Sequence, residues 1–112
     1  MKLETVQEDE TLVISVDETR IDAAVAIQFK DRMRELTSGG TGRVILDLGK
    51  VDFVDSSGLG AIVAAMKQLN GGQNIALCGL QPMVDRVFRL TRMNTIFAIH
   101  DDLPAARAAA AG

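Results

Sequence analysis

Hydrophobic and polar positions along this chain follow two periods, one typical of strands and one typical of helices. Short apolar runs rich in β-branched residues alternate with segments in which apolar residues recur every three or four positions. Runs of that length and composition predict β-strands. They occupy residues 3–7, 11–16, 43–48, 74–78 and 96–99. Because only the acidic residues 8–10 separate the first two strands, we expect these two to form an antiparallel pair.

The segment after the second strand predicts the first helix. Asp22 suits the N-cap, because its side chain can accept a hydrogen bond from a free backbone N–H group of the first turn. Glycine-rich residues 38–42 are expected to end the helix, since glycine adopts the left-handed conformation that closes helices. The apolar face of this helix comprises Val25, Ala26, Phe29, Met33 and Leu36.

Residues 51–60 lead from the third strand into the second helix, and the rest of the chain is organised around them. Asp55 and Ser56 both suit the N-cap, so a serine is expected at the start of this helix. Free N–H groups and the helix dipole favour an anion there, which predicts a place for a phosphate group. Residues 70–72 are expected to end the helix. Its core-facing stripe comprises Leu59, Ile62, Val63, Met66 and Leu69.

Two more helices are predicted near the C-terminus. Gln81 and Pro82 open the third helix, because proline has no N–H group to lose in a first turn. Asp101 or Asp102 is expected to cap the last helix, whose alanine-rich end (residues 105–111) has little to anchor it and is expected to fray. The inner face of the third helix is expected to comprise Met83, Val84, Val87 and Phe88.

This order of elements predicts an α/β fold. Strands that alternate with helices through short connections indicate a largely parallel mixed sheet of about four to five strands, packed with about four helices. The length of 112 residues and the lack of a linker or repeat predict one domain, residues 1–112.

Composition argues against several classes of function. The net charge is −3, from 12 basic and 15 acidic residues, and the chain has no Trp or Tyr; direct binding of nucleic acid is therefore not expected. Single cysteine and histidine residues, Cys78 and His100, cannot form an intrachain disulfide or a metal cluster, so we expect no metal and no cofactor. Cys78 is interpreted as a buried strand residue and His100 as a surface residue.

The sequence also bears on location. Its apolar segments are shorter than a membrane-spanning helix, and the first residues lack the apolar region of a signal peptide. We therefore expect a cytoplasmic protein without membrane insertion.

Known catalytic patterns fit the central stretch poorly. Ser56 and Ser57 lack the Gly-x-Ser-x-Gly context of a serine hydrolase. Gly58 and Gly60 would begin a dinucleotide-binding loop, but Val63 stands where the third glycine belongs. These two glycines are better explained by a close approach of the helix to the sheet or to a partner.

The sequence also fits poorly to two other kinds of phosphate site, the P-loop and the phosphoaspartate site. Residues 39–43 lack the Gly-Lys-[Ser/Thr] ending of a P-loop and precede a strand instead of a helix. A phosphoaspartate site with Mg²⁺ could use Asp17, Glu18 and Asp47, but the lysine that such a site needs at the end of a later strand is missing. These acids are interpreted as turn and strand-end residues.

Beyond these patterns, the sequence resembles the STAS domains, and within them the bacterial anti-sigma-factor antagonists, over almost its whole length. The most specific likeness is the strand at residues 44–48 followed by residues 51–60, which contain an Asp-Ser-Ser-Gly motif. Thr19 and the turn at residues 91–94 depart from the family, where glycines are common. Supporting segments are residues 20–24, 75–80, Pro82, 87–91 and 96–97.

The resemblance implies a phosphorylation switch without catalysis by the chain itself. Ser56 stands where the family is phosphorylated by a partner that is both an anti-sigma factor and a serine kinase of the histidine-kinase-like ATPase type. The unphosphorylated antagonist binds this partner and frees the sigma factor, and a metal-dependent serine/threonine phosphatase resets the cycle. Asp52 and Asp55 are expected to add negative charge beside the phosphate, and Ser57 is expected to cap the helix.

The family also binds its partner through the loop before the first helix. The resemblance therefore predicts a partner-binding surface formed by Arg20, Ile21, Asp22, Asp55, Ser56, Ser57, Gly58, Leu59 and Gly60. Two alternatives remain open. Some free-standing STAS domains are accessory subunits of lipid transporters, and a partner switch can control secretion or signalling without a sigma factor. The intact Asp-Ser-Ser-Gly motif favours the switch over the transporter subunit.

Overall fold

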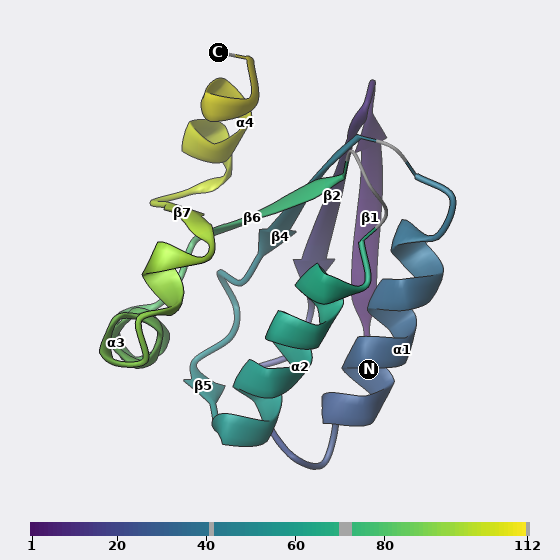
Figure 1. Cartoon of the computed structure of the whole chain (residues 1–112). Coiled ribbons are helices and arrows are strands. Elements are labelled where there is room, and N and C mark those ends of the chain that lie inside the picture. The colour runs from purple at the N-terminus through teal and green to yellow at the C-terminus, as the bar shows by residue number, and fades with distance from the viewer. Residues whose placement is uncertain (41, 70–72, 112) are drawn as a thin grey trace.

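Strands from both halves of the chain lie side by side in one sheet (Figure 1). The computed structural model describes residues 1–40, 42–69 and 73–111. Strand order is β1-β2-β4-β6-β7, with β1 antiparallel to β2 and the other pairs parallel. These strands are β1 (Leu3–Glu8), β2 (Thr11–Val16), β4 (Arg43–Asp47), β6 (Asn74–Cys78) and β7 (Ala98–His100). The expected α/β class, mixed sheet and antiparallel first pair are confirmed.

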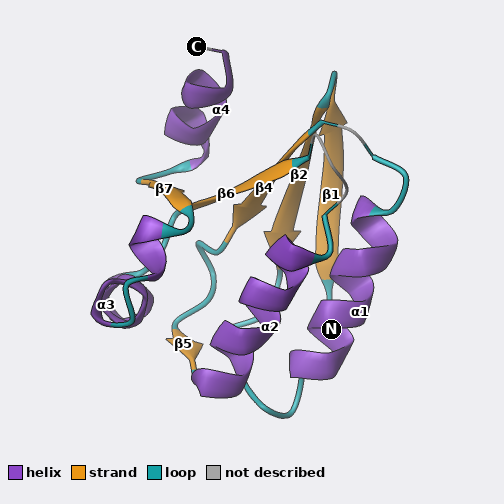
Figure 2. Ribbon diagram, viewed as in Figure 1, coloured by secondary structure: helices purple, strands orange, loops and turns teal. Residues whose placement is uncertain are grey.

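The described part of the chain also contains four α-helices and one short 3₁₀ helix, and α4 follows the last strand (Figure 2). Helices α1 and α2 pack against each other over the same face of the sheet. Helix α4 contacts β4, β6 and β7. The helices are α1 (Ala26–Thr37), α2 (Ser56–Lys67), α3 (Pro82–Leu90), η1 (Met93–Thr95) and α4 (Leu103–Ala111).

Alternation along the central strands builds the core. Ile14 pairs with Leu46, and Leu46 pairs with Leu77, so three fully buried side chains lie in one row beneath α1 and α2. Residues one position away point to the opposite face of the sheet. There a smaller cluster of Val13, Ile45 and Cys78 packs against Ala106 of α4.

A second, very small sheet was not predicted. Strands β3 (Arg20–Ile21) and β5 (Phe53–Val54) pair in parallel, and the N–H group of Asp52 extends this contact by donating to the carbonyl of Thr19 at 2.9 Å. Two-residue strands carry no detectable period, so the hydrophobic pattern cannot reveal them. Their pairing places the loop before α1 beside the loop before α2.

The predicted N-cap of the first helix at Asp22 is wrong, because the N-cap of α1 is Val25, three residues later, and the helix begins at Ala26. The carboxylate of Asp22 instead accepts the N–H of Ala24 at 3.1 Å, and its carbonyl accepts that of Val25 at 3.1 Å. These bonds hold a turn that precedes the helix. At the other end, Gly39 has φ = +77°, as expected for a glycine that closes a helix.

Helix α3 begins at Pro82, as predicted, but only part of its expected inner face is buried. Val84 and Phe88 are buried, Val87 is half-buried, and the side chain of Met83 is 60% exposed. A helix of nine residues buries only a narrow stripe, and Met83 lies beside that stripe. The expected end of the second helix at residues 70–72 lies outside the described residues.

The last strand begins at Ala98, two residues later than predicted. The N–H groups of Ile96 and Phe97 both donate to the carbonyl of Met93, at 3.0 and 2.9 Å, which withdraws them from the strand ladder. Helix α4 begins after Asp102, whose carboxylate accepts the N–H of Ala105 at 2.9 Å.

A helix that crosses a membrane needs about 20 consecutive, mostly apolar residues. Among residues 1–40, 42–69 and 73–111, no helix is long and apolar enough to cross a membrane.

Candidate functional site

The candidate site lies where β5 ends and α2 begins, and the turn that precedes β5 supports it. Leu48 and Val51 of this turn are fully buried. The N–H of Leu48 donates to the carbonyl of Cys78, and that of Val51 donates to the carbonyl of Leu48, both at 3.0 Å. The turn therefore gives the Asp-Ser-Ser-Gly motif a fixed support.

Asp55 is the N-cap of α2. One carboxylate oxygen accepts the N–H of Gly58 at 2.8 Å, and the other accepts the N–H of Ala23 at 3.1 Å. A single side chain thus joins the start of α2 to the loop before α1. Donation from the N–H of Gly58 is the main reason that the pKa of Asp55 lies below its ordinary value; burial opposes this, and the N–H groups of Ala23 and Ser57 reinforce it. Asp55 is therefore a carboxylate at neutral pH.

Gly58 is fixed by contact with β3. A Cβ atom on Gly58 would lie 1.8 Å from the backbone oxygen of Ile21, a distance that no side chain can tolerate. Gly58 and Ile21 are both buried, so α2 begins directly on the strand before α1. The expected close approach of a glycine to the rest of the fold is confirmed at this position.

Ser56 and Ser57 are the first two residues of α2, and both are exposed. The expected serine at the helix start is therefore confirmed. The expected helix cap by Ser57 is wrong, because Asp55 already occupies that position. Leu59 is half-buried against the core, whereas Gly60 is exposed and a Cβ there would meet nothing within 4 Å.

The loop before α1 brings a cation to the same surface. The guanidinium carbon of Arg20 lies 4.2 Å from the centroid of the Phe53 ring, and its Nε atom lies 3.2 Å from a carboxylate oxygen of Asp22. Arg20 is exposed, whereas Ile21 is fully buried, so the side chain of Ile21 faces the core.

The charges around Ser56 are mainly negative. Asp22, Asp52 and Asp55 lie in the two loops that β3 and β5 hold together, and Arg20 is already paired with Asp22. The N–H group of Gly58 at this helix start already donates to an anion, the carboxylate of Asp55. The expected place for a phosphate group here stays a prediction.

A shallow groove between α1 and α2 adjoins the serines and was missed by sequence reasoning. Its volume is 300 Å³. Gly60 and other small residues of α2 form one wall, and the side chain of Ile27, which is 70% exposed, stands on the other. An exposed isoleucine within an amphipathic helix was the available signal. The lining comprises Ala26, Ile27, Lys30, Ser57, Gly60, Ala61 and Ala64.

The other candidate residues are not brought to this site. Asp17 contacts Lys50 and Lys2, at 3.0 and 3.2 Å, and these two hydrogen-bonded cations lower its pKa. Cys78 is buried, and burial raises the pKa of its thiol to about 12. His100 is half-buried in β7, which corrects its interpretation as a surface residue. The described residues contain no group of three or more possible metal ligands.

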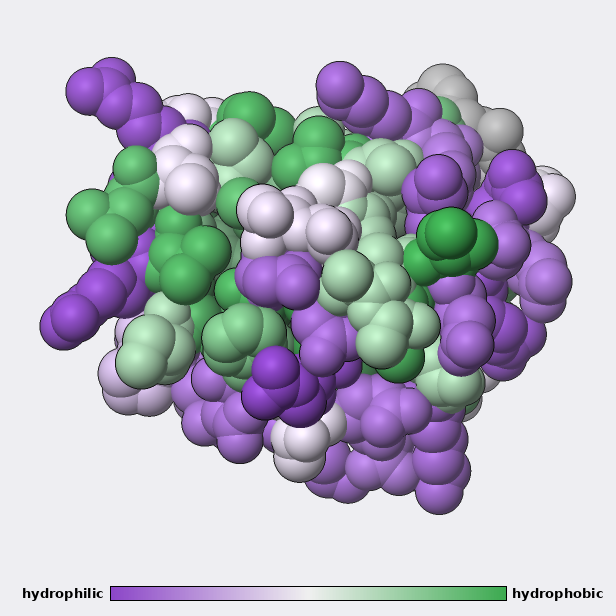
Figure 3. Space-filling model, turned by 90° about the horizontal axis from the view of Figure 1, so that it is seen from below, coloured by the Kyte–Doolittle hydropathy of each residue, from purple (hydrophilic) through white to green (hydrophobic). Residues whose placement is uncertain are grey.

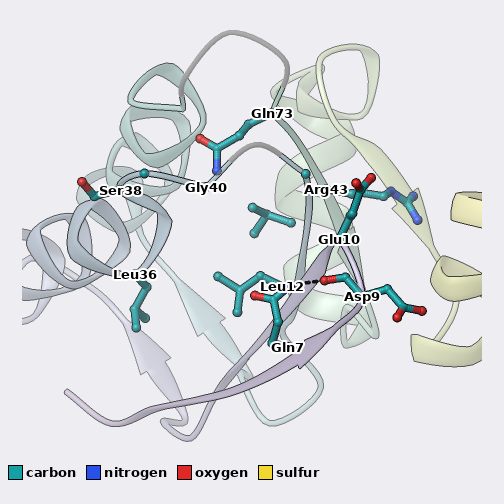
Figure 4. Close-up of a pocket in the computed structure, with 12 residues that line it drawn as sticks. Gln7, Asp9, Glu10, Leu12, Leu36, Ser38, Gly40, Arg43 and Gln73 are labelled. Atoms are coloured by element: carbon teal, nitrogen blue, oxygen red, sulfur yellow. Dashed lines mark hydrogen bonds between the residues drawn. The ribbon is translucent and has the colours of Figure 1, made fainter.

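A larger hollow of 410 Å³ lies at the other end of the sheet (Figure 4). It is formed where α1 ends and β4 begins, near Leu36, Ser38 and Arg43, together with the β1–β2 turn. In that turn the side-chain amide of Gln7 donates to the carbonyl of Asp9 at 2.7 Å. The start of α2 and this hollow therefore face opposite ends of the molecule.

Comparison with known proteins gives consistent results. The family model for the STAS domain matches residues 2–106. The Bordetella bronchiseptica protein BtrV, which is named as an anti-sigma factor antagonist, is 33% identical over 97% of this chain and 94% of its own length. An anti-sigma-B factor antagonist of Staphylococcus epidermidis is 24% identical over 90% of this chain and 94% of its own length. A Thermotoga maritima structure, also named as an anti-sigma factor antagonist, superposes with a TM-score of 0.84 at 25% identity, covering 98% of this chain and 95% of the other.

Proposed function

The chain belongs to the STAS domain family, and from this premise we propose that it is an anti-sigma-factor antagonist whose binding is switched by phosphorylation of Ser56. Relatives from Bordetella and Staphylococcus that carry this name align with nearly the whole chain. We further propose that the chain acts in the cytoplasm and catalyses no reaction.

The observation that carries the proposal is the division of tasks within the Asp-Ser-Ser-Gly motif. Asp55 and Gly58 make the contacts that hold α2 in place, whereas Ser56 is exposed and is not needed for them. A kinase can therefore reach the hydroxyl of Ser56 without opening the fold.

The effect of the phosphate follows from its surroundings. A phosphoserine carries about −1.5 to −2 charges at neutral pH, and here it would join Asp22, Asp52 and Asp55. The helix dipole favours a negative charge by ~0.3–1 kcal/mol, and Ser56 is exposed to solvent, which screens the nearby acids, so the fold should stay intact. A partner that carries its own acids would meet concentrated negative charge where it formerly met a small hydroxyl. Binding is therefore lost at the surface, with the fold unchanged.

The partner is proposed to contact both loops. Arg20 and Asp22 from the first loop and Ser56, Ser57 and Gly60 from the start of α2 share one face, because Asp55 and the β3–β5 pair hold the loops together. Ile21 and Gly58 are proposed to hold this surface in position from beneath it. The exposed part of the Leu59 side chain is proposed to contact the partner. The partner is proposed to be an anti-sigma factor with serine kinase activity of the histidine-kinase-like ATPase type. A metal-dependent serine/threonine phosphatase would reverse the modification.

The test uses the full chain as bait in lysate of its source cells. Wild type and Ser56→Ala should both capture an ATPase of that type, whereas Ser56→Asp should capture much less. Incubation of the captured ATPase with the wild-type chain and ATP, followed by phosphopeptide mapping, should place the phosphate on Ser56.

Ser57→Ala is the matched control, since it removes the neighbouring exposed hydroxyl. This variant should be captured and phosphorylated like the wild type. Phosphate found on Ser57 alone, or equal capture by Ser56→Asp, would contradict the proposal. Capture of transporter subunits in place of an ATPase of the kinase type would favour the role of a transport accessory.

A further inference from the structure

Exposed apolar residues are concentrated in one short segment of the chain. Of the five large apolar side chains that are at least half exposed in the described residues, three lie between positions 83 and 96, in α3 and the turn after it. Met83 is 60% exposed, Leu90 is 77% exposed and Ile96 is 50% exposed. Scattered exposed apolar residues are common, but several on one element indicate an interaction surface.

Two of these residues belong to a stripe along the outside of α3. Met83, Val87 and Leu90 are spaced by four and three residues, so they lie on one side of the helix. Val84 and Phe88 form the neighbouring side, which is buried in the core. We call Met83, Val87 and Leu90 the α3 stripe. Figure 3 shows apolar side chains gathered over α3, at the left of the view, with strongly hydrophilic side chains projecting beside them.

Arginines border the α3 stripe. Arg86 and Arg89 line a shallow hollow of 410 Å³ together with Leu90. Arg89 is paired with Asp85 at 2.8 Å, whereas Arg86 and Arg92 have no ion pair within the described residues. Residues 82–92 contain three arginines and one aspartate, so their net charge is +2, although the whole chain carries −3.

We propose that the α3 stripe is a second docking surface, which binds an acidic amphipathic helix of another protein. Apolar residues of that helix would cover Met83, Val87 and Leu90, and its acidic residues would pair with Arg86 and Arg92. This is the chemistry of a helix laid against an apolar surface with complementary charge at its rim. The surface does not include Ser56, so the inference does not rest on the proposed function.

The same charges disfavour two other occupants. In a dimer formed through α3, the arginines of one copy would face those of the other, and like charges across an interface oppose association. An anionic membrane would attract the arginines but repel a chain whose net charge is −3. Three apolar side chains on the outside of a nine-residue helix also offer little area to insert between lipids.

The test follows amide chemical shifts of the full chain during titration with synthetic helical peptides of about 15 residues, a length at which helices become stable. One peptide carries leucine at every third and fourth position with glutamate elsewhere, and the matched peptide has lysine in place of glutamate. The glutamate peptide should shift the amides of α3 in a saturable manner and bind about tenfold or more tightly than the lysine peptide.

Variants should locate the binding. Leu90→Ser and Arg86→Glu should each weaken binding of the glutamate peptide by about tenfold, because they remove an apolar contact and a charge contact. Ile27→Ser is the matched control: Ile27 is nearly as exposed as Leu90 (70% against 77%) but lies on α1, so its loss should leave binding unchanged. Ser56→Asp should also bind normally, which separates this inference from the phosphorylation switch.

Several results would overturn the proposal. These are equal binding of the two peptides, no saturable shift with either, shifts centred on the start of α2, or loss of binding in Ser56→Asp. Two further measurements identify what binds the α3 stripe if it is not an acidic helix. Sedimentation with vesicles of phosphatidylserine and phosphatidylcholine that is lost in Arg86→Glu would assign the stripe to a membrane. Self-association that is lost in Leu90→Ser would assign it to a second copy of the chain.

Discussion

The inner and outer sides of the first turns of α2 differ sharply, although they share one short motif. On the inner side, Gly58 touches the backbone of Ile21, and Asp55 bonds both the helix and the preceding loop. Ile62 continues this side into the core and is fully buried. On the outer side, Ser56, Ser57 and Gly60 are exposed.

The difference shows how one helix start can combine exposed hydroxyls with a fixed support. Ser56, the proposed phosphorylation site, is separate from the residues that hold the helix in place, so its modification need not disturb folding. Substitutions on the inner side should therefore change stability, and substitutions on the outer side should change binding. The loss of stability should be largest for a buried residue such as Ile62 and smallest for an exposed residue such as Ser57.

Ile62→Ala should cause the largest loss, because it leaves a cavity beneath α2. We expect the free energy of unfolding to fall by roughly 2–5 kcal/mol, measured by urea unfolding. Ile27→Ala is the control, since that side chain is 70% exposed, and it should change stability by no more than about 0.5 kcal/mol. Equal midpoints for Ile62→Ala and the wild type would mean that the inner side is not packed as described.

Gly58→Ala should destabilise by about 1–3 kcal/mol, because its Cβ would overlap the backbone oxygen of Ile21. Gly60→Ala has the opposite expectation. A Cβ there meets nothing within 4 Å, so the better helix propensity of alanine should stabilise the protein by up to about 1 kcal/mol. Thermal unfolding measures the change in stability of both variants directly. A loss of stability in Gly60→Ala as large as that in Gly58→Ala would remove the distinction between the two sides.

Asp55→Asn should destabilise less than Gly58→Ala, in a manner that depends on pH. The pKa of Asp55 is lowered in the folded chain, so its ionised form stabilises the fold above the ordinary aspartate pKa. This contribution is lost as the pH falls through the lowered pKa of the folded state. The difference between wild type and Asp55→Asn should thus be full at pH 7 and shrink under acid conditions. A gap in unfolding free energy that stays constant from neutral to acid pH would show that the charge of Asp55 contributes nothing.

Ser57→Ala should have the smallest effect on stability, within about 0.5 kcal/mol. Ser57 is exposed, and Asp55 supplies the cap that Ser57 would otherwise provide. Urea unfolding under the conditions used for Ile62→Ala provides the measurement. A loss near 1 kcal/mol, the typical cost of a missing cap, would mean that Ser57 shares the capping role.

Much of the sheet could be predicted from the sequence, because apolar runs such as residues 11–16 and 74–78 carry a strand signal on their own. The short strands β3 and β5 could not be predicted, since two residues have no period. The start of α1 was misplaced for a related reason. A local pattern favours a helix from Asp22, but the N–H of Ala23 is bonded to Asp55, which lies 32 residues away in the sequence.

The site was predicted in outline and missed in detail. Asp55 and Ser56 stand at the helix start, as the residue types indicate. Which of the two adjacent hydroxyls caps the helix, or whether a carboxylate does, depends on backbone angles that residue types do not reveal. The exposure of Met83 likewise depends on where neighbouring elements end, and the approach of α2 to Ile27 depends on how the two helices pack, so the α3 stripe and the groove beside Ser57 required the structure.

The central claim is that a phosphate on Ser56 blocks a partner without changing the fold. Titration of the captured partner ATPase with unmodified chain and with chain phosphorylated on Ser56 tests it most directly. The account predicts that phosphorylation weakens binding by about tenfold or more, because opposed like charges cost more than the ~1.4 kcal/mol that this factor requires. The unfolding midpoint of the phosphorylated chain should match that of the unmodified chain. Equal affinity of the two forms, or weaker binding accompanied by a large loss of stability, would contradict the account.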